Sequence, residues 1–314
     1  MGKAVIAIHG GAGAISRAQM SPALEQQYIA ALSAVVEAGQ ALLAAGGSAL
    51  DAVTEAVRQL EECPLFNAGK GAVFTRDATH ELDACVMDGY TLKAGAVAGV
   101  SRIENPVLAA RLVLDASPHV LLVGEGAHAF VASQGMPLVD PALFSTPERL
   151  AQLQRAQAGD GDDIVLDHDA PLDPDRKFGT VGAVALDLQG NLAAATSTGG
   201  MTNKLPGRVG DSPLPGAGCY ANNANVAVSC TGSGEVFMRT LAAYDIAALM
   251  EYGGMSLHEA CAGVVMDKIP ALGGSGGVIA IDREGNVALP FNCEGMYRGY
   301  GYVGDAPNVG IYQE

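Results

Sequence analysis

The sequence predicts an α+β protein in which β-sheets stack on one another and helices cover them. Predicted strands lie at both ends of each half of the chain, with predicted helices between them. A strand followed by Asp-x-x-Gly-Asn and a second strand occurs twice, over residues 182–191 and 277–286. The chain has 314 residues, of which 49% are hydrophobic and 17% charged, so it can bury a large core. These patterns leave the order of the strands open.

The first half begins with a strand and two helices. The apolar residues 3–8 are typical of a buried strand, and the glycine-rich residues 9–13 predict the turn that ends it. Residues 21–22 are Ser-Pro, which combines a favourable N-cap with a residue suited to the first helical position. The helix that begins there ends at the Gly-Gly pair 46–47, and Ser48 caps a second helix.

The rest of the first half is predicted to contain strands and one more helix. Residues 71–100 are expected to form strands around turns at residues 75–79 and 87–90. The Asn-Pro pair 105–106 starts a helix, and residues 119–123 form the next strand.

The second half begins after an acidic segment. Residues 156–175 hold seven Asp and no Lys or Arg, a composition typical of a solvated linker, which we place at residues 156–179. The spacing of these acids does not match the twelve-residue calcium loop. A strand follows over residues 179–187, a helix over 235–251, and Ser256 with Glu259 forms the capping box of another helix.

The charge and cysteine content exclude several classes of function. Lys and Arg number 18 against 34 Asp and Glu, which gives a net charge of −16. Phosphate backbones and anionic membrane surfaces would repel this chain, so we expect neither nucleic acid nor membrane as a partner. No apolar run approaches the ~20 residues of a membrane span. The six cysteines form no Cys-x-x-Cys, which is typical of a cytoplasmic protein with reduced thiols.

Several common catalytic and cofactor motifs are missing. The Gly-x-Gly at residues 11–13 lacks the third glycine and the acidic residue of a dinucleotide fingerprint. The glycine-rich residues 273–277 lead into a predicted strand instead of a helix N-terminus, which weakens a phosphate site there. The six histidines show no His-Glu-x-x-His, and no Gly-x-Ser-x-Gly is present.

A Gly-Thr pair at the start of a strand offers another chemistry. A threonine hydroxyl becomes a useful nucleophile when it is the first residue of a chain, because its own α-amine then serves as the base. That amine titrates at ~7.7–8.0, near working pH. Gly179 before Thr180 tolerates the strained peptide that self-cleavage requires. By itself, Gly-Thr at this position is usually only the beginning of a strand.

Several blocks of sequence add to this observation. They are residues 9–13, 66–69, 81–89, 179–187, 196–204, 206–213, 216–221 and 229–235. In content and order they resemble the plant-type L-asparaginase/isoaspartyl peptidase family over nearly the whole chain, most strongly its bacterial isoaspartyl dipeptidases with asparaginase activity. The resemblance implies an N-terminal-nucleophile hydrolase with a four-layer αββα sandwich, made as a precursor that cuts itself before a threonine.

The resemblance also implies roles for individual residues. Thr180 resembles the nucleophile, with cleavage between Gly179 and Thr180, and Thr198 resembles the hydroxyl beside it. Thr231 and Gly232 resemble the pair that forms the oxyanion hole. Asn67 resembles a residue near the scissile peptide.

Substrate contacts are implied along two loops. Arg208 resembles the residue that binds the substrate α-carboxylate, a task suited to a guanidinium fork, and Asp211 resembles the partner of the α-ammonium. The remaining substrate-binding positions in these loops are Val209, Gly210, Thr231, Gly232, Ser233 and Gly234. As an isolated pair, Arg208 and Asp211 would be indistinguishable from a surface salt bridge.

The family holds a sodium ion on main-chain carbonyls, and the corresponding loop is present in this chain. The resemblance places the carbonyl ligands at Leu60, Glu61, Cys63, Phe66, Ala68 and Lys70. Lys70 departs from the apolar residue more usual in the family. No cofactor is expected for catalysis.

Together these implications predict an amidohydrolase that cleaves β-aspartyl dipeptides and L-asparagine through a β-aspartyl ester on the threonine. Self-cleavage would give an α subunit of residues 1–179 and a β subunit of residues 180–314, which form one globular domain. A dimer of such cleaved heterodimers is expected from the family. The alternatives are glycosylasparaginase, which shares the nucleophile, and a non-catalytic αββα binding protein that never cleaves.

Overall fold

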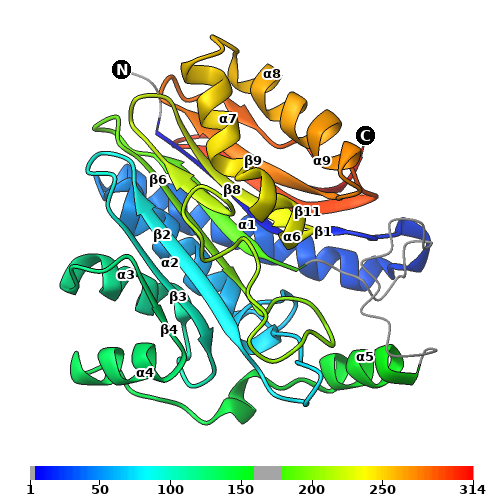
Figure 1. The fold of residues 1–314 in the computed structure, drawn as a ribbon. Coiled ribbons are helices and arrows are strands. Elements are labelled where there is room, and N and C mark those ends of the chain that lie inside the picture. Colours follow the sequence, from blue (N-terminus) through cyan, green and yellow to red (C-terminus); the bar gives the residue numbers. More distant parts are fainter. Residues whose placement is uncertain (1–3, 159–178, 314) are drawn as a thin grey trace.

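The structure is a computed structural model that describes residues 4–158 and 179–313. Within these residues the strands are β1 (Val5–Gly13), β2 (Leu82–Asp88), β3 (Ala94–Val100), β4 (Leu121–Val123), β5 (Val181–Leu186), β6 (Leu192–Thr198), β7 (Cys219–Ala221), β8 (Val226–Gly232), β9 (Gly276–Asp282), β10 (Val287–Ala288), β11 (Gly295–Tyr302) and β12 (Asn308–Tyr312). They form an eight-stranded sheet in the order β12-β11-β1-β5-β6-β2-β3-β4 and a four-stranded sheet in the order β10-β9-β8-β7. Neighbouring strands are antiparallel except β3 and β4. The chain is therefore of the predicted α+β class (Figure 1).

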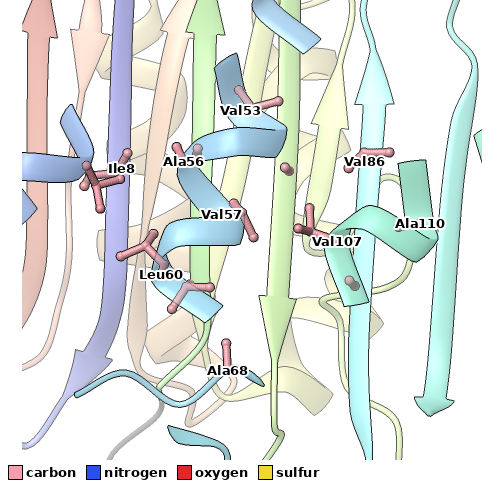
Figure 2. Close-up of a cluster of buried hydrophobic side chains, with 14 of the residues drawn as sticks. Ile8, Val53, Ala56, Val57, Leu60, Ala68, Val86, Val107 and Ala110 are labelled. Atoms are coloured by element: carbon pink, nitrogen blue, oxygen red, sulfur yellow. The ribbon is translucent and has the colours of Figure 1, made fainter. Parts of the chain in front are cut away.

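Helices from the first half of the chain cover one face of the large sheet. They are α1 (Pro22–Ala44), α2 (Ala49–Glu62), α3 (Pro106–Ala116) and α4 (Gly124–Ser133). The next helix, α5 (Pro147–Ala158), packs beside the loop after α2, where its Arg149 donates to the carbonyl of Gly71. Short 3-10 turns lie at Arg17–Gln19, Gly69–Gly71 and Pro141–Phe144. Figure 2 shows Val53, Val57 and Leu60 of α2 and Val107 of α3 over the strands, in one cluster with Ile8 of β1. This cluster fixes α2 against β5, the strand that begins beside Thr180.

Helices from the second half cover the small sheet. They are α6 (Gly234–Thr240), α7 (Ala242–Glu251), α8 (Leu257–Ala262) and α9 (Ile269–Ala271), with a π-helical turn at Gly263–Lys268. Phe237 of α6, Ile246 of α7 and Leu257 of α8 pack with Val228 of β8 and Val278 of β9. In Figure 1, α7 and α8 lie above β8 and β9, away from α2 and α3.

The two sheets face each other through a separate apolar cluster. Val5 and Ala7 of β1 point into it, whereas Ile6 and Ile8 point toward the helices. Ile279 of β9 contributes from the small sheet. Side chains alternate between the faces of a strand, so both faces of β1 are buried. This explains why the sequence at its start is apolar without a break.

Most local predictions are confirmed. Ser21 and Ser48 each accept a hydrogen bond from a backbone amide of the first turn of their helix, and Ser256 with Glu259 forms the capping box. The two repeated hairpins share one design. The Asp187 carboxylate accepts hydrogen bonds from the amides two and four residues ahead, and Asp282 does the same.

Other local predictions are wrong. Residues 9–13 are not a turn, because β1 continues through Gly13 by pairing with β11, with a register shift between His9 and Gly11. The helix predicted over 235–251 is two helices that meet at Leu241 (φ +49°). The first amides of α7 donate to carbonyls of residues 216–217 instead of continuing α6.

The remaining differences concern the boundaries of elements. Residues 71–81 form no strand beyond a single bridge at Thr75, and β4 covers only the last part of residues 119–123. The helices α4 and α5 were not predicted. Because α5 continues to Ala158, the predicted linker begins with helical residues, and its residues 159–178 lie outside the described residues.

One described helix passes a simple test for a membrane span. By length and composition alone, α1 is long and apolar enough to cross a membrane. Leu32 and Val36 on one of its faces belong to the same buried cluster as β1. The core helix of a globular protein passes the same test.

Candidate active site

Thr180 lies at the beginning of β5, where the large sheet brings it beside the end of β6. The pairing of Val181 with Ser197 places Thr180 next to Thr198. Thr180 is 7% exposed, and its hydroxyl donates to Thr198 Oγ1 at 3.3 Å. Thr198 Oγ1 also accepts from the amide of Gly200 at 3.0 Å. In the uncleaved chain the nitrogen of Thr180 is a peptide nitrogen, so the base proposed above exists only after the Gly179–Thr180 bond is broken.

His9 holds the backbone of Thr180 from the neighbouring strand β1. Its Nδ1 lies 2.9 Å from the carbonyl oxygen of Thr180, and its Nε2 lies 2.9 Å from Ser229 Oγ. A carbonyl only accepts, so Nδ1 carries the proton and Nε2 accepts from the serine hydroxyl. Burial lowers the pKa of His9 to about 3, which keeps the ring neutral. Sequence reasoning assigned no role to His9, because nothing in its spacing connects it to Thr180.

Asn67 packs directly against Gly179. A Cβ added to Gly179 would lie 2.2 Å from the Cβ of Asn67, so only glycine fits before the threonine. The Asn67 amide donates to the carbonyl of Gly200 at 2.7 Å and accepts from the amide of Val73 at 2.9 Å. Both ends of the amide are therefore used in fixing the loop around the scissile bond.

The residues predicted to form the oxyanion hole lie at the end of β8. Thr231 is fully buried, and its Oγ1 accepts a hydrogen bond from the amide of Ala12 at 3.2 Å. Because the amide donates, the hydroxyl proton of Thr231 is not used in this contact. Gly232 has φ +152°, and a Cβ there would lie 2.3 Å from the carbonyl oxygen of Ser275. Only glycine allows this close approach of β8 to the start of β9.

Arg208 and Asp211 meet on one wall of a small pocket. Arg208 donates from Nε and Nη2 to the two carboxylate oxygens of Glu235, each at 2.8 Å. This leaves the Nη1 side of the fork free of the Glu235 pair. A Cβ on Gly234 would lie 2.8 Å from Arg208 Nη2 and 3.1 Å from Asp211 Oδ1. The glycine therefore lets both charged groups approach the backbone.

The carboxyl group of Asp211 is buried and incompletely satisfied. The residue is 3% exposed, and its Oδ2 has no hydrogen-bond partner among the described residues. Burial raises the pKa of Asp211 to about 7, although the nearby Arg208 charge opposes this rise. A ligand cation that reached Oδ2 would satisfy the carboxylate and restore its charge. Sequence reasoning found Arg208 and Asp211 but assigned no role to Glu235, which orients the guanidinium.

Thr180 and the Arg208–Asp211 pair line the same pocket, which in the uncleaved chain has a volume of about 10 Å³, room for about one water molecule. Its lining residues are Gly179, Thr180, Thr198, Gly200, Met201, Arg208, Gly210, Asp211, Ser212, Gly232 and Gly234. The predicted site residues Asn67, Val209, Thr231 and Ser233 are not among them. Gly200, Met201 and Ser212 line the pocket without having been predicted. The chemical groups in this lining are those that a small substrate with opposite charges close to a carbonyl would need.

The loop after α2 brings main-chain carbonyls together. A Cβ on Gly69 (φ +51°) would lie 2.3 Å from Glu61 O, and one on Gly71 would lie 2.1 Å from Phe66 O. Lys70 directs its ammonium to Glu104, 3.3 Å away, so its side chain leaves the carbonyls uncovered. No cluster of three or more His, Cys, Asp or Glu suited to a metal occurs within residues 4–158 and 179–313. A cation in this loop would therefore depend on carbonyl oxygens, a donor type that hard cations prefer.

The side chain of Glu61 plays a different part in the same loop. It is fully buried, and its Oε1 accepts from Ser197 Oγ at 2.6 Å and from the amide of Val107 at 2.9 Å. Burial raises the pKa of this carboxyl to about 8. Ser197 belongs to β6 next to Thr198, so Glu61 connects the loop to the strand that carries the second threonine.

Comparisons with known proteins give one consistent result. A family model described as "Asparaginase" matches residues 2–311. The isoaspartyl peptidase of Escherichia coli K12 is 75% identical over 315 residues, covering 100% of this chain and 98% of that protein. The isoaspartyl peptidase of Salmonella typhimurium is 74% identical and covers 100% of both chains. The isoaspartyl peptidase/L-asparaginase of Xenopus laevis is 40% identical over 99% of this chain and 96% of its own length.

Proposed function

The chain belongs to the asparaginase family, and on that premise we propose that it is a threonine hydrolase of β-aspartyl dipeptides and L-asparagine. The observation that carries the proposal is the pocket shared by Thr180, Thr198, Arg208 and Asp211. It brings the Thr180 hydroxyl, at a strand start behind a glycine, together with charges of both signs, which supports a nucleophilic role for Thr180. The relatives named isoaspartyl peptidase agree with this chemistry.

The reaction begins with self-cleavage between Gly179 and Thr180. Thr180 Oγ attacks the carbonyl carbon of Gly179, and the peptide nitrogen leaves with a proton as the new α-amine. Water then hydrolyses the resulting ester, which frees the hydroxyl. Asn67 packs against Gly179 on one side of this bond, and His9 holds the Thr180 carbonyl on the other. These two contacts keep the reacting atoms together.

Turnover repeats the same chemistry on a substrate. The α-amine of Thr180 takes the hydroxyl proton while Oγ attacks the side-chain carbonyl of the substrate. The C–N bond breaks, and the proton passes from the amine to the leaving nitrogen. Water then hydrolyses the β-aspartyl ester with the same amine as base. The negative oxygen of each tetrahedral state would be stabilised by donors at Thr231 and Gly232.

Recognition of the aspartyl part follows from the charges in the pocket. Arg208, oriented by Glu235, presents its free edge to the α-carboxylate of the substrate. Asp211 pairs with the α-ammonium, which also satisfies its orphaned oxygen. An α-linked aspartyl peptide lacks this pair of free groups on one carbon, because its α-carboxylate is consumed in the peptide bond. The site therefore selects isoaspartyl over normal aspartyl linkages.

The architecture and assembly are part of the proposal. Two facing sheets with helices on their outer faces support the four-layer αββα sandwich of N-terminal-nucleophile hydrolases. Self-cleavage would yield subunits of residues 1–179 and 180–314, which we expect to assemble as a dimer of heterodimers. All six cysteines are free thiols, which supports a reducing compartment such as the cytoplasm.

A sodium ion in the loop of residues 60–70 is also proposed. The residues fit the ion, because the main-chain carbonyl oxygens of Glu61 and Phe66 lie against Gly69 and Gly71, which have no side chain to cover them. The predicted ligands are the main-chain carbonyls of Leu60, Glu61, Cys63, Phe66, Ala68 and Lys70. When bound, the ion would supply structural support to the loop that holds Asn67.

One experiment tests the function directly. Purified protein is incubated, analysed by intact mass and N-terminal sequencing, and then assayed with β-Asp-Leu, α-Asp-Leu and L-asparagine at equal concentration. We expect a new N-terminus at Thr180, with hydrolysis of β-Asp-Leu and asparagine but not of α-Asp-Leu. An N-acetylglucosaminyl-asparagine substrate serves as the comparison for glycosylasparaginase. A single uncleaved and inactive chain would instead support a binding protein.

A further inference from the structure

A second cavity shares the lining residue Gly179 with the aspartyl pocket. Its volume is about 480 Å³, and it is open to solvent. Gly179 lines both cavities, and Asn67 lines the second one. The Gly179–Thr180 bond therefore lies where the two spaces meet. None of the substrate contacts described above uses this second cavity.

Arg149 on α5 lines this cavity together with two further charged residues of the same helix, Glu148 and Arg155. Its Nε donates to the carbonyl of Gly71 at 2.8 Å, and its Nη1 donates to Gln152 Oε1 at 3.0 Å. Both acceptors are neutral, and Arg149 forms no ion pair with any residue of the described part of the chain. Burial lowers the pKa of the guanidinium, which nevertheless stays charged at neutral pH. The side chain is partly buried, and although the Glu148 charge lies nearby, no carboxylate of the described residues is hydrogen-bonded to the guanidinium, so a ligand carboxylate could pair with it.

Three aromatic rings give the cavity an apolar wall. Tyr28 stacks on Tyr297 with ring centroids 4.1 Å apart, and Phe66 meets both rings edge-on. The hydroxyl of Tyr28 donates to the carbonyl of Leu65. Tyr297 is 6% exposed, and its phenol oxygen has no hydrogen-bond partner among the described residues. The lining therefore combines an apolar surface with the Arg149 guanidinium, which has no ion pair among the described residues, and with the unsatisfied Tyr297 hydroxyl.

The reaction itself places the leaving group beside this cavity. The leaving nitrogen receives its proton from the α-amine of Thr180, so it must come within about 3 Å of that amine. Before self-cleavage the nitrogen of the Thr180 amine is bonded to the carbonyl carbon of Gly179. The leaving group of a substrate therefore occupies the neighbourhood that Gly179 vacates, and Gly179 lines the second cavity.

We propose that this cavity is the leaving-group subsite, in which Arg149 binds the free C-terminal carboxylate of an isoaspartyl dipeptide and the Tyr28–Tyr297–Phe66 wall contacts an apolar side chain. The inference rests on the proposed function and adds to it the class of leaving group. An amino acid with a free carboxylate satisfies the Arg149 guanidinium. Ammonia, released from asparagine, reaches none of these residues. Arg149 thus distinguishes dipeptidase from asparaginase activity.

The first test uses only the cleaved wild-type enzyme. Values of kcat/KM are measured for β-Asp-Leu, β-Asp-leucinamide and L-asparagine. The amide differs from β-Asp-Leu only in lacking the terminal negative charge. Loss of a charge-assisted hydrogen-bonded pair predicts that kcat/KM for the amide is about 10- to 100-fold lower. Equal values for the two dipeptides would overturn the inference, and this comparison does not depend on any variant folding.

The second test compares Arg149→Gln with a matched surface variant, Arg111→Gln. Arg111 lies on α3, where it pairs with Asp51 and Asp115 and does not line the cavity. We expect Arg149→Gln to lower kcat/KM for β-Asp-Leu by about 10- to 100-fold and to remove the preference over the amide. The value of kcat/KM for asparagine should fall much less. Arg111→Gln should leave kcat/KM unchanged for all three substrates.

Different outcomes would contradict the leaving-group subsite and the proposed hydrolase function. An equal loss on all three substrates would mean that Arg149 acts only by holding Gly71, which contradicts the subsite. Wild-type protein that hydrolyses neither asparagine nor β-Asp-Leu would instead contradict the proposed function. If Arg149→Gln does not self-cleave, Arg149→Lys keeps the charge but not the fork, and a partial loss confined to β-Asp-Leu is expected.

Discussion

The buried carboxyl of Asp211 makes the stability of the uncleaved chain depend on pH. Burial raises its pKa from 3.8 to about 7. Between these values the folded chain retains a proton that the unfolded chain has released, so stability falls as pH rises through this window. At ~1.4 kcal/mol per pKa unit, this difference in proton binding lowers the stability of the folded chain by about 4 kcal/mol at pH 8, where the buried carboxyl is ionised. At pH 5, where the buried carboxyl is still protonated, the loss is about 2 kcal/mol.

Asp211→Asn tests this magnitude because it removes the ionisation but keeps the shape of the side chain. The change is made in a Thr180→Ala chain, so that both proteins compared are uncleaved. We expect Asp211→Asn to raise the free energy of unfolding by about 4 kcal/mol at pH 8 and by about half as much at pH 5. Urea unfolding at the two pH values measures the difference. Asp267→Asn, at an exposed position, is the control.

The same substitution should have the opposite effect on function. In the cleavable chain, a neutral amide at residue 211 cannot pair with the α-ammonium of the substrate, so asparagine turnover should be lost although the fold is more stable. Such a gain of stability at the expense of activity is expected where a site keeps a buried charge for its ligand. A lower free energy of unfolding for Asp211→Asn than for its parent at pH 8 would contradict a destabilising buried charge at Asp211. A difference in free energy of unfolding that does not change with pH would contradict it as well.

Three further predictions concern the nucleophile, the guanidinium and the carbonyl loop. Thr180→Ala should remain one inactive chain on denaturing electrophoresis, because cleavage and turnover both need the hydroxyl; cleavage at the same bond would contradict this. Arg208→Ala should lose about 100-fold or more in kcat/KM for asparagine, with partial recovery in Arg208→Lys, which cannot reproduce the paired contact with Glu235. Gly71→Ala should lower the melting temperature, because its Cβ would lie 2.1 Å from Phe66 O; an unchanged melting temperature would show that the loop relaxes freely.

The sequence by itself determined the features that depend on neighbours within a few residues. The caps at Ser21, Ser48 and Ser256 and the hairpins at Asp187 and Asp282 all form as predicted. Each depends on a side chain that bonds to the backbone two to four residues away, so the local sequence contains both partners. The roles of the site residues came from a resemblance spread along the chain, since Gly-Thr alone is an ordinary start of a strand.

Tertiary structure decided whatever depends on partners far away in the chain. His9 meets the carbonyl of Thr180 from 171 residues away, and Glu235 orients Arg208 from 27 residues away. Pairing with β11 extends β1 through glycines that read locally as a turn. The cavity around Arg149 gathers α1, α5 and the loop after α2 beside Gly179. Local patterns do not encode such contacts, because the free energy that selects them comes from burying surfaces that meet only in the folded chain.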